Sequence, residues 1–230
     1  MLGGINDLGQ IVGSFLAGDA THTFLFDAGT YTIIDVPGAT FTMARGISNS
    51  GQILGESRVG TTARAFVFDG GSFTFPNFPG ASITTYTSHM NDEGGIVGRY
   101  EVAGVPQGFL LTDSVYATVP QVPGSISWAA LGINNHGDIV GGWTAPDNTR
   151  HGFLLTNDVL TLLDAPGASL TTSVNINDSG QIVGNFIVNG MDHAFIATVL
   201  PAIPEPGSYL LLSFGLFVML SGRLRHRSGR

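Results

Sequence analysis

Three histidines stand at equivalent places in this sequence and are the first candidates for chemistry. His22, His151 and His193 each lie two residues before a phenylalanine. A histidine can act as a general base or as a metal ligand. A zinc site, however, needs three or four ligands at about 2 Å from one ion, whereas these residues recur at widely separated points of the chain. We therefore interpret them as structural or solvent-edge side chains of separate units.

Carboxylates are the second candidates. Glycoside hydrolysis requires two carboxyl groups about 5–10 Å apart, and Glu56, Glu93 and Glu101 share no common position. The Asn/Asp/Gly turns could be taken for Ca²⁺ loops, but they lack the alternating acidic spacing that gathers six or more oxygens. The chain also contains no nucleophile elbow, no metalloprotease helix motif and no phosphate-binding glycine loop. We expect no catalytic residue, no metal and no cofactor, with Ca²⁺ as the alternative.

A nine-residue motif of the type Ile-Asn-Asp-x-Gly-Gln-Ile-Val-Gly positions all of these residues. It begins at Ile5, Ile47, Met90, Ile133 and Ile176, with a period of 42 and then 43 residues. Asn and Asp satisfy nearby backbone groups, and the glycine supplies the positive φ of a tight hairpin. The predicted turn residues are Asp7 and Gly9, Asn49 and Gly51, Asp92 and Gly94, Asn135 and Gly137, and Asp178 and Gly180.

Each repeat contains four short strand signals and a Pro-Gly turn, and the chain is rich in glycine and phenylalanine. Four antiparallel strands in about 40–50 residues are typical of a β-propeller blade. We predict an all-β propeller, or propeller-like arc, of about five four-stranded blades over residues 1–199, with the hairpin turns on one rim. The first copy lacks most of its opening strand, and prolines interrupt the fourth strand of the last. Ring closure stays open.

The motif, followed by His-x-Phe-Leu and Asp-x-Pro-Gly-Ala, resembles the HAF family of probable extracellular repeats. The third copy departs most, with Met90, Gly95 and Gln107 in place of Ile, Gln and His. The order of hairpin, glycine, aromatic strand and proline turn is also similar to a kelch-type blade. The resemblance implies secretion and a repeat architecture, and no established activity.

The C-terminal part has a different composition. Residues 200–206 form a linker, residues 207–222 carry no charge, and residues 223–230 form a basic end. The apolar segment is near the lower limit for a transmembrane helix. Arg223, Arg225 and Arg227 predict a cytoplasmic C-terminus. Pro204-Glu205-Pro206, the apolar segment and the arginines together resemble the PEP-CTERM sorting signal of Gram-negative bacteria, which implies processing near the motif by an exosortase-type enzyme.

Charge is divided unevenly along the chain. The net charge is −8, with −11 in residues 1–203 and +3 beyond them. An acidic body argues against nucleic acid as a partner. Because it should also repel anionic polymers, we expect a neutral glycan or a matrix protein instead. The residues after Met1 do not resemble a secretory signal peptide, so export leads us to expect that the natural start lies further upstream.

We predict an exported, non-enzymatic cell-surface or matrix protein, held transiently in the inner membrane by residues 207–222 and then released to the surface or medium. Loops of variable sequence on a repeated frame would present its contacts. The alternative is a polysaccharide hydrolase with its site in the propeller channel. The variable segments are residues 56–63, 100–107, 142–150 and 185–192.

Overall fold

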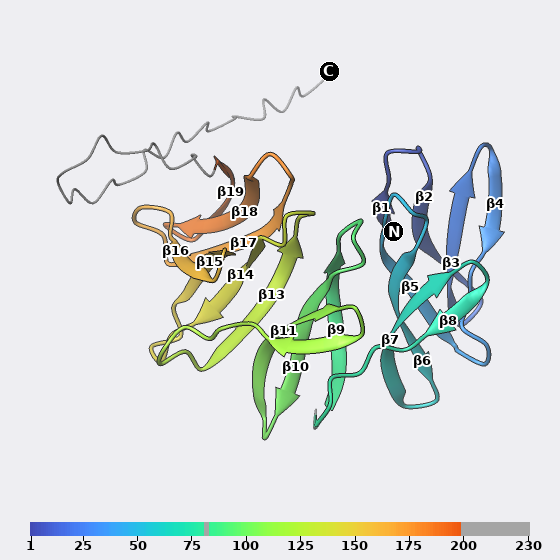
Figure 1. Cartoon of the computed structure of the whole chain (residues 1–230), viewed down its shortest axis with the longest axis horizontal. Coiled ribbons are helices and arrows are strands. Elements are labelled where there is room, and N and C mark those ends of the chain that lie inside the picture. The colour runs from blue at the N-terminus through green and yellow to red at the C-terminus, as the bar shows by residue number, and fades with distance from the viewer. Residues whose placement is uncertain (81–82, 199–230) are drawn as a thin grey trace, which may run out of the picture.

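The computed structural model describes residues 1–80 and 83–198, and all regular elements in this part of the chain are β-strands. They form five consecutive antiparallel units, here called blades 1 to 5 (Figure 1). Blade 1 contains β1 (Leu2–Ile5), β2 (Ile11–Ala17), β3 (Ala20–Asp27) and β4 (Thr30–Ile33). Blade 2 contains β5 (Phe41–Ile47), β6 (Ile53–Val59), β7 (Thr62–Asp69) and β8 (Ser72–Thr74). This arrangement confirms the all-β prediction.

The remaining blades repeat the pattern. Blade 3 contains β9 (Ile83–Met90), β10 (Ile96–Val102), β11 (Val105–Thr112) and β12 (Val115–Thr118). Blade 4 contains β13 (Ser127–Ile133), β14 (Ile139–Thr144), β15 (Arg150–Thr156) and β16 (Val159–Leu163). Blade 5 contains β17 (Leu170–Ile176), β18 (Gln181–Val188) and β19 (Met191–Thr198). The described residues therefore give blade 5 three strands, and the first strand of blade 1 is short, as expected.

The motif turns have the predicted conformation. In the first copy the Asn6 amide donates to the Gln10 carbonyl, and the Gly9 amide donates to the Asn6 carbonyl. The Asn6 side-chain oxygen accepts from the amides of Leu8 and Gln10, and Gly9 has a φ of 77°. A side chain with a Cβ rarely adopts this backbone conformation, which explains the glycine at this position of every copy.

Most of the hydrophobic core lies between blades. Each pair of neighbouring blades shares one cluster of buried side chains, and the described residues contain four such clusters for four interfaces. The second strand of a blade contributes to two interfaces, because alternate residues face opposite sides of a sheet. In blade 2, for example, Ile53 packs toward blade 1 and Leu54 toward blade 3, and both are fully buried. One blade alone could not bury both faces.

A glycine beneath a phenylalanine ring recurs in each blade. A Cβ added to Gly141 would lie 2.6 Å from Cε1 of Phe153 and would also collide with the Ala129 carbonyl oxygen. A Cβ on Gly13 would lie 2.7 Å from Cζ of Phe24. The glycine that ends each motif therefore allows the ring of the third strand to lie directly on the second strand.

The five blades follow one another in an arc, with blade 1 (blue) and blade 5 (orange) at its two ends (Figure 1). Direct backbone pairing between blades is slight: single parallel bridges join Thr21 to Phe41 and Arg150 to Leu170. Side chains must therefore hold the blades together. No helix long and apolar enough to cross a bilayer occurs among the residues described here. The predicted membrane helix at 207–222, the linker and the basic end lie outside them.

The variable segments differ from the loops expected. Most of their residues belong to the second and third strands of the blades, and only short tips at 60–61, 103–104, 145–149 and 189–190 lie between strands. The strands continue through these segments, and some of their side chains are buried, such as Ser57, Tyr100 and Phe186. Sequence variability here marks strand ends joined by short tips, not long loops.

Candidate functional site

A groove between blades 2 and 3 gathers charged and aromatic side chains. We call it the blade 2–3 groove. The space between its lining residues, solvent at its open side included, is about 260 Å³. Blade 2 supplies strands β5, β6 and β7, and blade 3 supplies Tyr86 on β9. Its lining residues are Phe41, Glu56, Ser57, Arg58, Ala63, Arg64 and Tyr86.

Aromatic rings position the arginines at this groove. The Arg58 guanidinium lies 5.3 Å from the centroid of the Phe41 ring, which is its partner on the neighbouring strand. Arg99 lies 4.9 Å from the Tyr86 ring in the same way. Arg64 lies 4.3 Å from the Phe75 ring. A cation over a ring face is attracted by the ring quadrupole while its N–H groups stay available at the edge.

The charge of the groove differs from that of the whole protein. Residues 1–203 contain five arginines, and Arg58, Arg64 and Arg99 all lie at or beside this groove with exposed side chains. The groove carboxylate, Glu56, is paired with Arg45 at 3.0 Å. The acidic body therefore carries a local group of cations. Exposed guanidinium groups beside aromatic faces can bind an anionic, ring-shaped ligand.

The predicted turn residues form a continuous ladder across all five blades. Backbone amides of Asp7, Asn49, Asp92 and Asn135 each donate to Oδ1 of the corresponding residue in the next blade, at 2.9, 2.6, 2.8 and 2.8 Å. Asn49 Nδ2 also donates to Oδ2 of Asp7 and Asp92, at 2.8 and 3.0 Å. Asn135 Nδ2 donates likewise to Asp92 and Asp178, at 3.1 and 2.9 Å. The turns therefore share one rim.

This ladder corrects one expectation. The sequence suggested that both turn residues, Asn and Asp, satisfy the backbone of their own hairpin. Only the first of them, such as Asn6, does so, whereas the second points to the neighbouring blade. The spacing of one full repeat between partners explains why a local interpretation missed it.

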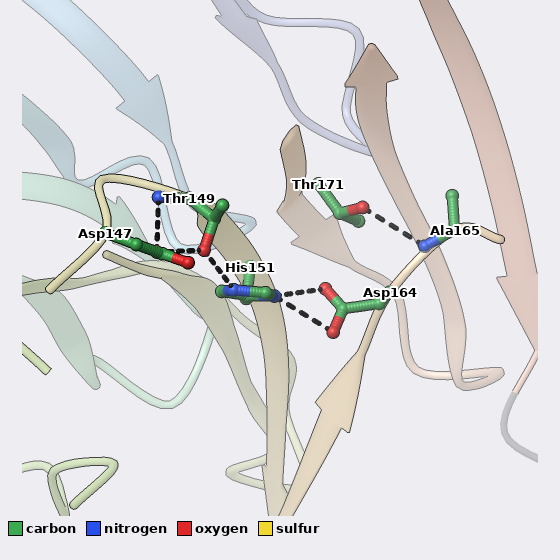
Figure 2. A network of polar contacts seen from close by, with 6 residues as sticks. All are labelled: Asp147, Thr149, His151, Asp164, Ala165 and Thr171. Carbon is green, nitrogen blue, oxygen red and sulfur yellow. Dashed lines mark hydrogen bonds and ion pairs between the residues drawn. The ribbon is translucent and has the colours of Figure 1, made fainter. Parts of the chain in front are cut away.

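The histidines lie in separate blades, each near its own partner. His22 Nδ1 lies 2.6 Å from Asp35 in blade 1. Figure 2 shows the corresponding contact in blade 4, where His151 Nδ1 lies 3.0 Å from both carboxylate oxygens of Asp164. His193 stacks on Phe186 at 5.1 Å. In the part of the chain that the structure describes, no three His, Asp or Glu side chains are gathered for a metal ion.

The network around His151 has the connectivity of a hydroxyl–histidine–carboxylate relay. Thr149 Oγ1 lies 2.9 Å from His151 Nε2 (Figure 2). However, the Thr149 hydroxyl donates its hydrogen to Asp147 at 2.6 Å, so it is not offered to the histidine. This hydrogen bond is also the main cause that lowers the pKa of Asp147. Blade 1 contains the same His–Asp pair, which indicates an anchor for the loop after the fourth strand.

The centre of the arc is narrow. His89 on β9 lies 3.3 Å from the Asn175 side chain on β17, across the intervening strand β13. On β13, a Cβ added to Gly132 would lie 2.7 Å from the Asn175 Cα. Burial lowers the pKa of His89, against smaller opposing effects of a backbone hydrogen bond at Ile133 and of the Asp92 charge. The side chain of His89 thus contacts a side-chain amide. Glu56 lies on β6, Glu93 in the turn before β10, and Glu101 on β10.

The blade 2–3 groove was not identified from the sequence. Its signal was the clustering of Arg45, Arg58, Arg64 and Arg99 within two repeats of an otherwise acidic body. The His–Asp pairs had a signal too, because a histidine precedes its carboxylate by thirteen residues in both blade 1 and blade 4. The processing motif Pro204-Glu205-Pro206 and the arginines after residue 222 lie outside the described residues.

Comparisons with known proteins place the fold in the β-propeller class. No protein-family model matches the sequence, and no curated protein matches it. Among solved structures, TolB from Acinetobacter baumannii has a TM-score of 0.57 at 11% identity, over 81% of this chain and 51% of that one. A prolyl endopeptidase has a TM-score of 0.58 at 12% identity, over 87% and 35%. The chain thus spans about half and about a third of these proteins.

A third similar structure is a mutant Aleuria aurantia lectin in complex with Fucα1-6GlcNAc. Its TM-score is 0.50 at 13% identity, over 89% of this chain and 79% of that one. Another structure of this lectin, with a TM-score of 0.48, is described as a six-bladed β-propeller with a novel fucose recognition mode. At these identities the likeness concerns the fold alone. The blade count differs, since the described part of this chain has five.

Proposed function

We propose that this protein is an exported, non-enzymatic surface or matrix component that binds an anionic glycan in the blade 2–3 groove. One observation carries the binding proposal: Arg58 and Arg64 line the same groove as Phe41 and Tyr86. Aromatic faces present a flat apolar surface on which sugar rings can lie. Guanidinium groups bind carboxylates through paired N–H bonds. A uronic acid combines a ring and a carboxylate, so it matches both features.

The proposed ligand differs from the neutral glycan expected from the net charge. Repulsion by an acidic body acts over the Debye length, about 8–10 Å at physiological salt. Arg58 and Arg64 line the groove, and Arg99 lies beside its Tyr86 ring. At very low salt, repulsion by the net charge of the protein should weaken binding of an anionic ligand. We expect this weakening to be smaller than the net charge alone suggests, because the arginines at the groove attract the ligand.

Titration calorimetry with an oligomer of galacturonic acid tests the binding proposal. Arg58→Gln together with Arg64→Gln should weaken binding about tenfold or more, since a hydrogen bond to a charged group contributes about 1.5–3 kcal/mol. Arg150→Gln is the matched control, because Arg150 lies on β15 of blade 4. Two results would contradict the proposal. One is an uncharged galactose oligomer that binds with equal affinity, and the other is an equal loss of affinity in the double variant and in the Arg150→Gln control.

The export proposal rests on the C-terminal residues of the sequence. A Pro-Glu-Pro motif, an apolar segment and clustered arginines occur there in order. In a Gram-negative host that has an exosortase-type enzyme, the tagged product of the intact gene should appear in a shortened form outside the inner membrane. Glu205→Gln with Pro206→Ala should retain the longer form at the membrane, whereas Pro201→Ala should not. Identical processing of all three proteins would argue against sorting by this signal.

The alternative function, a polysaccharide hydrolase with a site in the channel, is tested in the same preparation. Incubation of each oligomer with the protein, followed by chromatography of the products, should show no cleavage. Cleavage abolished by His89→Gln would instead support the enzyme.

A further inference from the structure

The ladder of turn residues alternates strictly between aspartate and asparagine and ends in an aspartate on both sides. An asparagine lies between each pair of aspartates and donates to both. In the described structure Asp7 receives such a bond only from blade 2, and Asp178 only from blade 4. Each terminal carboxylate therefore has one side on which an amide donor could still be placed.

The end blades also leave apolar positions exposed that are buried or half-buried in the other blades. The residue two before the terminal glycine of the motif faces the preceding blade, and the next residue faces the following blade. Val12, Leu54, Val97 and Val140 are all 0% exposed, whereas the corresponding Val183 of blade 5 is 43% exposed. In the third strand, Leu154 is 4% exposed and its counterpart Ile196 is 64% exposed.

The opposite face of blade 1 shows the same mismatch. Ile5 is 66% exposed, while its counterparts Met90, Ile133 and Ile176 are 8%, 2% and 5% exposed. Each uncovered face is thus one half of an interblade interface. Each retains the apolar residues that pack against a neighbour elsewhere in the arc.

We infer that the two end faces together receive one further repeat of the same kind, whose ladder residue is asparagine. The alternation of aspartate and asparagine along the ladder decides how many blades can close into a ring. Direct closure of five blades would bring Asp178 against Asp7 with no amide between the two carboxylates, and like charges repel when adjacent. Six is the next number for which an alternating ladder closes without two adjacent aspartates. A sixth turn with asparagine donates to both of them, as Asn49 and Asn135 do.

A second copy of this chain fits the faces less well. Joined end to end, it would place Asp178 of one copy against Asp7 of the other, which again leaves two carboxylates side by side. The apolar columns match in such a dimer, but the ladder does not. The occupant is therefore a single blade with an asparagine turn, and not a second five-blade arc.

A duplicated repeat tests this directly. Residues 127–171, which contain the Asn135 turn, are fused in register before Met1 of the full chain. The fused protein should be monomeric, and its melting temperature should rise by roughly 5 °C or more, because both end faces become buried. Amide exchange in β18 around Val183 should slow at least tenfold. The matched fusion carries aspartate in place of the added asparagine and should lose most of both gains.

Each result decides the matter. Equal stabilisation by the asparagine and aspartate fusions would overturn the assignment of an asparagine blade. So would an unchanged melting temperature together with unchanged exchange at Val183. If the original chain sediments as a dimer in which Val183 and Ile5 are already protected, a second copy is the occupant. A control fusion that misfolds is recognised by loss of the slow exchange at Val97. The unfused chain then gives the answer: Asp178→Asn should dimerise more readily than the unaltered chain, because it would place an amide beside Asp7, and equal behaviour of the two would overturn the role of the ladder.

Discussion

At the scale of single residues, the pairing of a glycine with a phenylalanine decides whether a blade can pack. The ring of Phe153 is fully buried and lies where a Cβ on Gly141 would stand. This contact was predictable, because the same two residue types recur in each motif. The partner of each ladder residue was not predictable, because hydrogen bonding to a residue one repeat away leaves no local pattern.

Gly141→Ala should lower the free energy of unfolding by about 2–3 kcal/mol, since the new methyl group collides with a buried ring and with backbone. Gly142→Ala is the neighbouring control. Its Cβ would meet the Nε of Arg150 at 3.3 Å, at the end of a flexible side chain, so its effect should stay within about 1 kcal/mol. Urea denaturation of both variants measures the difference. Equal losses would show that the ring does not depend on the glycine.

The buried His89 should make stability depend on pH. Its folded-state pKa is lowered by burial, so the unfolded chain takes up a proton at a higher pH than the folded chain. Stability attributable to this residue is therefore present above pH 6.5 and decreases as the pH falls below that value. Denaturation at pH 7.5 and pH 5.5 should show a smaller loss for His89→Gln than for the unaltered protein. A loss of the same size in both would contradict this assignment.

At the scale of elements, the strands were largely predictable, because β-branched and aromatic runs alternate with Gly, Asn and Pro turns. The variable segments were misjudged as loops, since charged residues such as Glu56 and Arg58 occur inside β6. The exposed side chain of Arg58 alternates on this strand with the buried Ser57. The groove joins two blades, because Arg58 on β6 and Tyr86 on β9 belong to different blades.

Asn135→Asp should weaken the connection between blades 3, 4 and 5. The change removes the amide that donates to Asp92 and Asp178 and places three carboxylates in a row. We expect a loss of about 1–3 kcal/mol, with partial recovery at 1 M salt, because the ladder is partly exposed to solvent. His136→Asp, at the exposed position beside it, adds the same charge outside the ladder and should cost less than about 1 kcal/mol. Similar losses would assign the effect to charge alone.

At the scale of the whole molecule, the arc is a series of blades in which most of the hydrophobic core lies between neighbouring blades. The period of the repeat made this architecture predictable, whereas the positions of the five blades around the arc required the structure. The groove could not be located from the sequence either, because it joins two repeats. Proteins built from stacked repeats derive their stability from the units and from nearest-neighbour interfaces.

Substitutions at one position of the repeat should therefore differ between the middle and the end of the arc. Val140→Ala should cost about 2 kcal/mol, because it removes fully buried methyl groups. Val183→Ala, at the same position of blade 5, should cost less than about 1 kcal/mol, because that side chain is 43% exposed. Thermal unfolding of the two purified variants makes the comparison. Equal costs would mean that another surface already covers Val183 in solution.

The most direct test of the central claim is hydrogen–deuterium exchange of the full chain with and without a galacturonic acid oligomer. Binding in the blade 2–3 groove should slow exchange in β5, β6, β7 and β9, which carry the groove residues, and should leave β14, β15 and β18 unchanged. Protection centred on the His151 network of blade 4, or no protection at a concentration that saturates the calorimetric signal, would contradict the account.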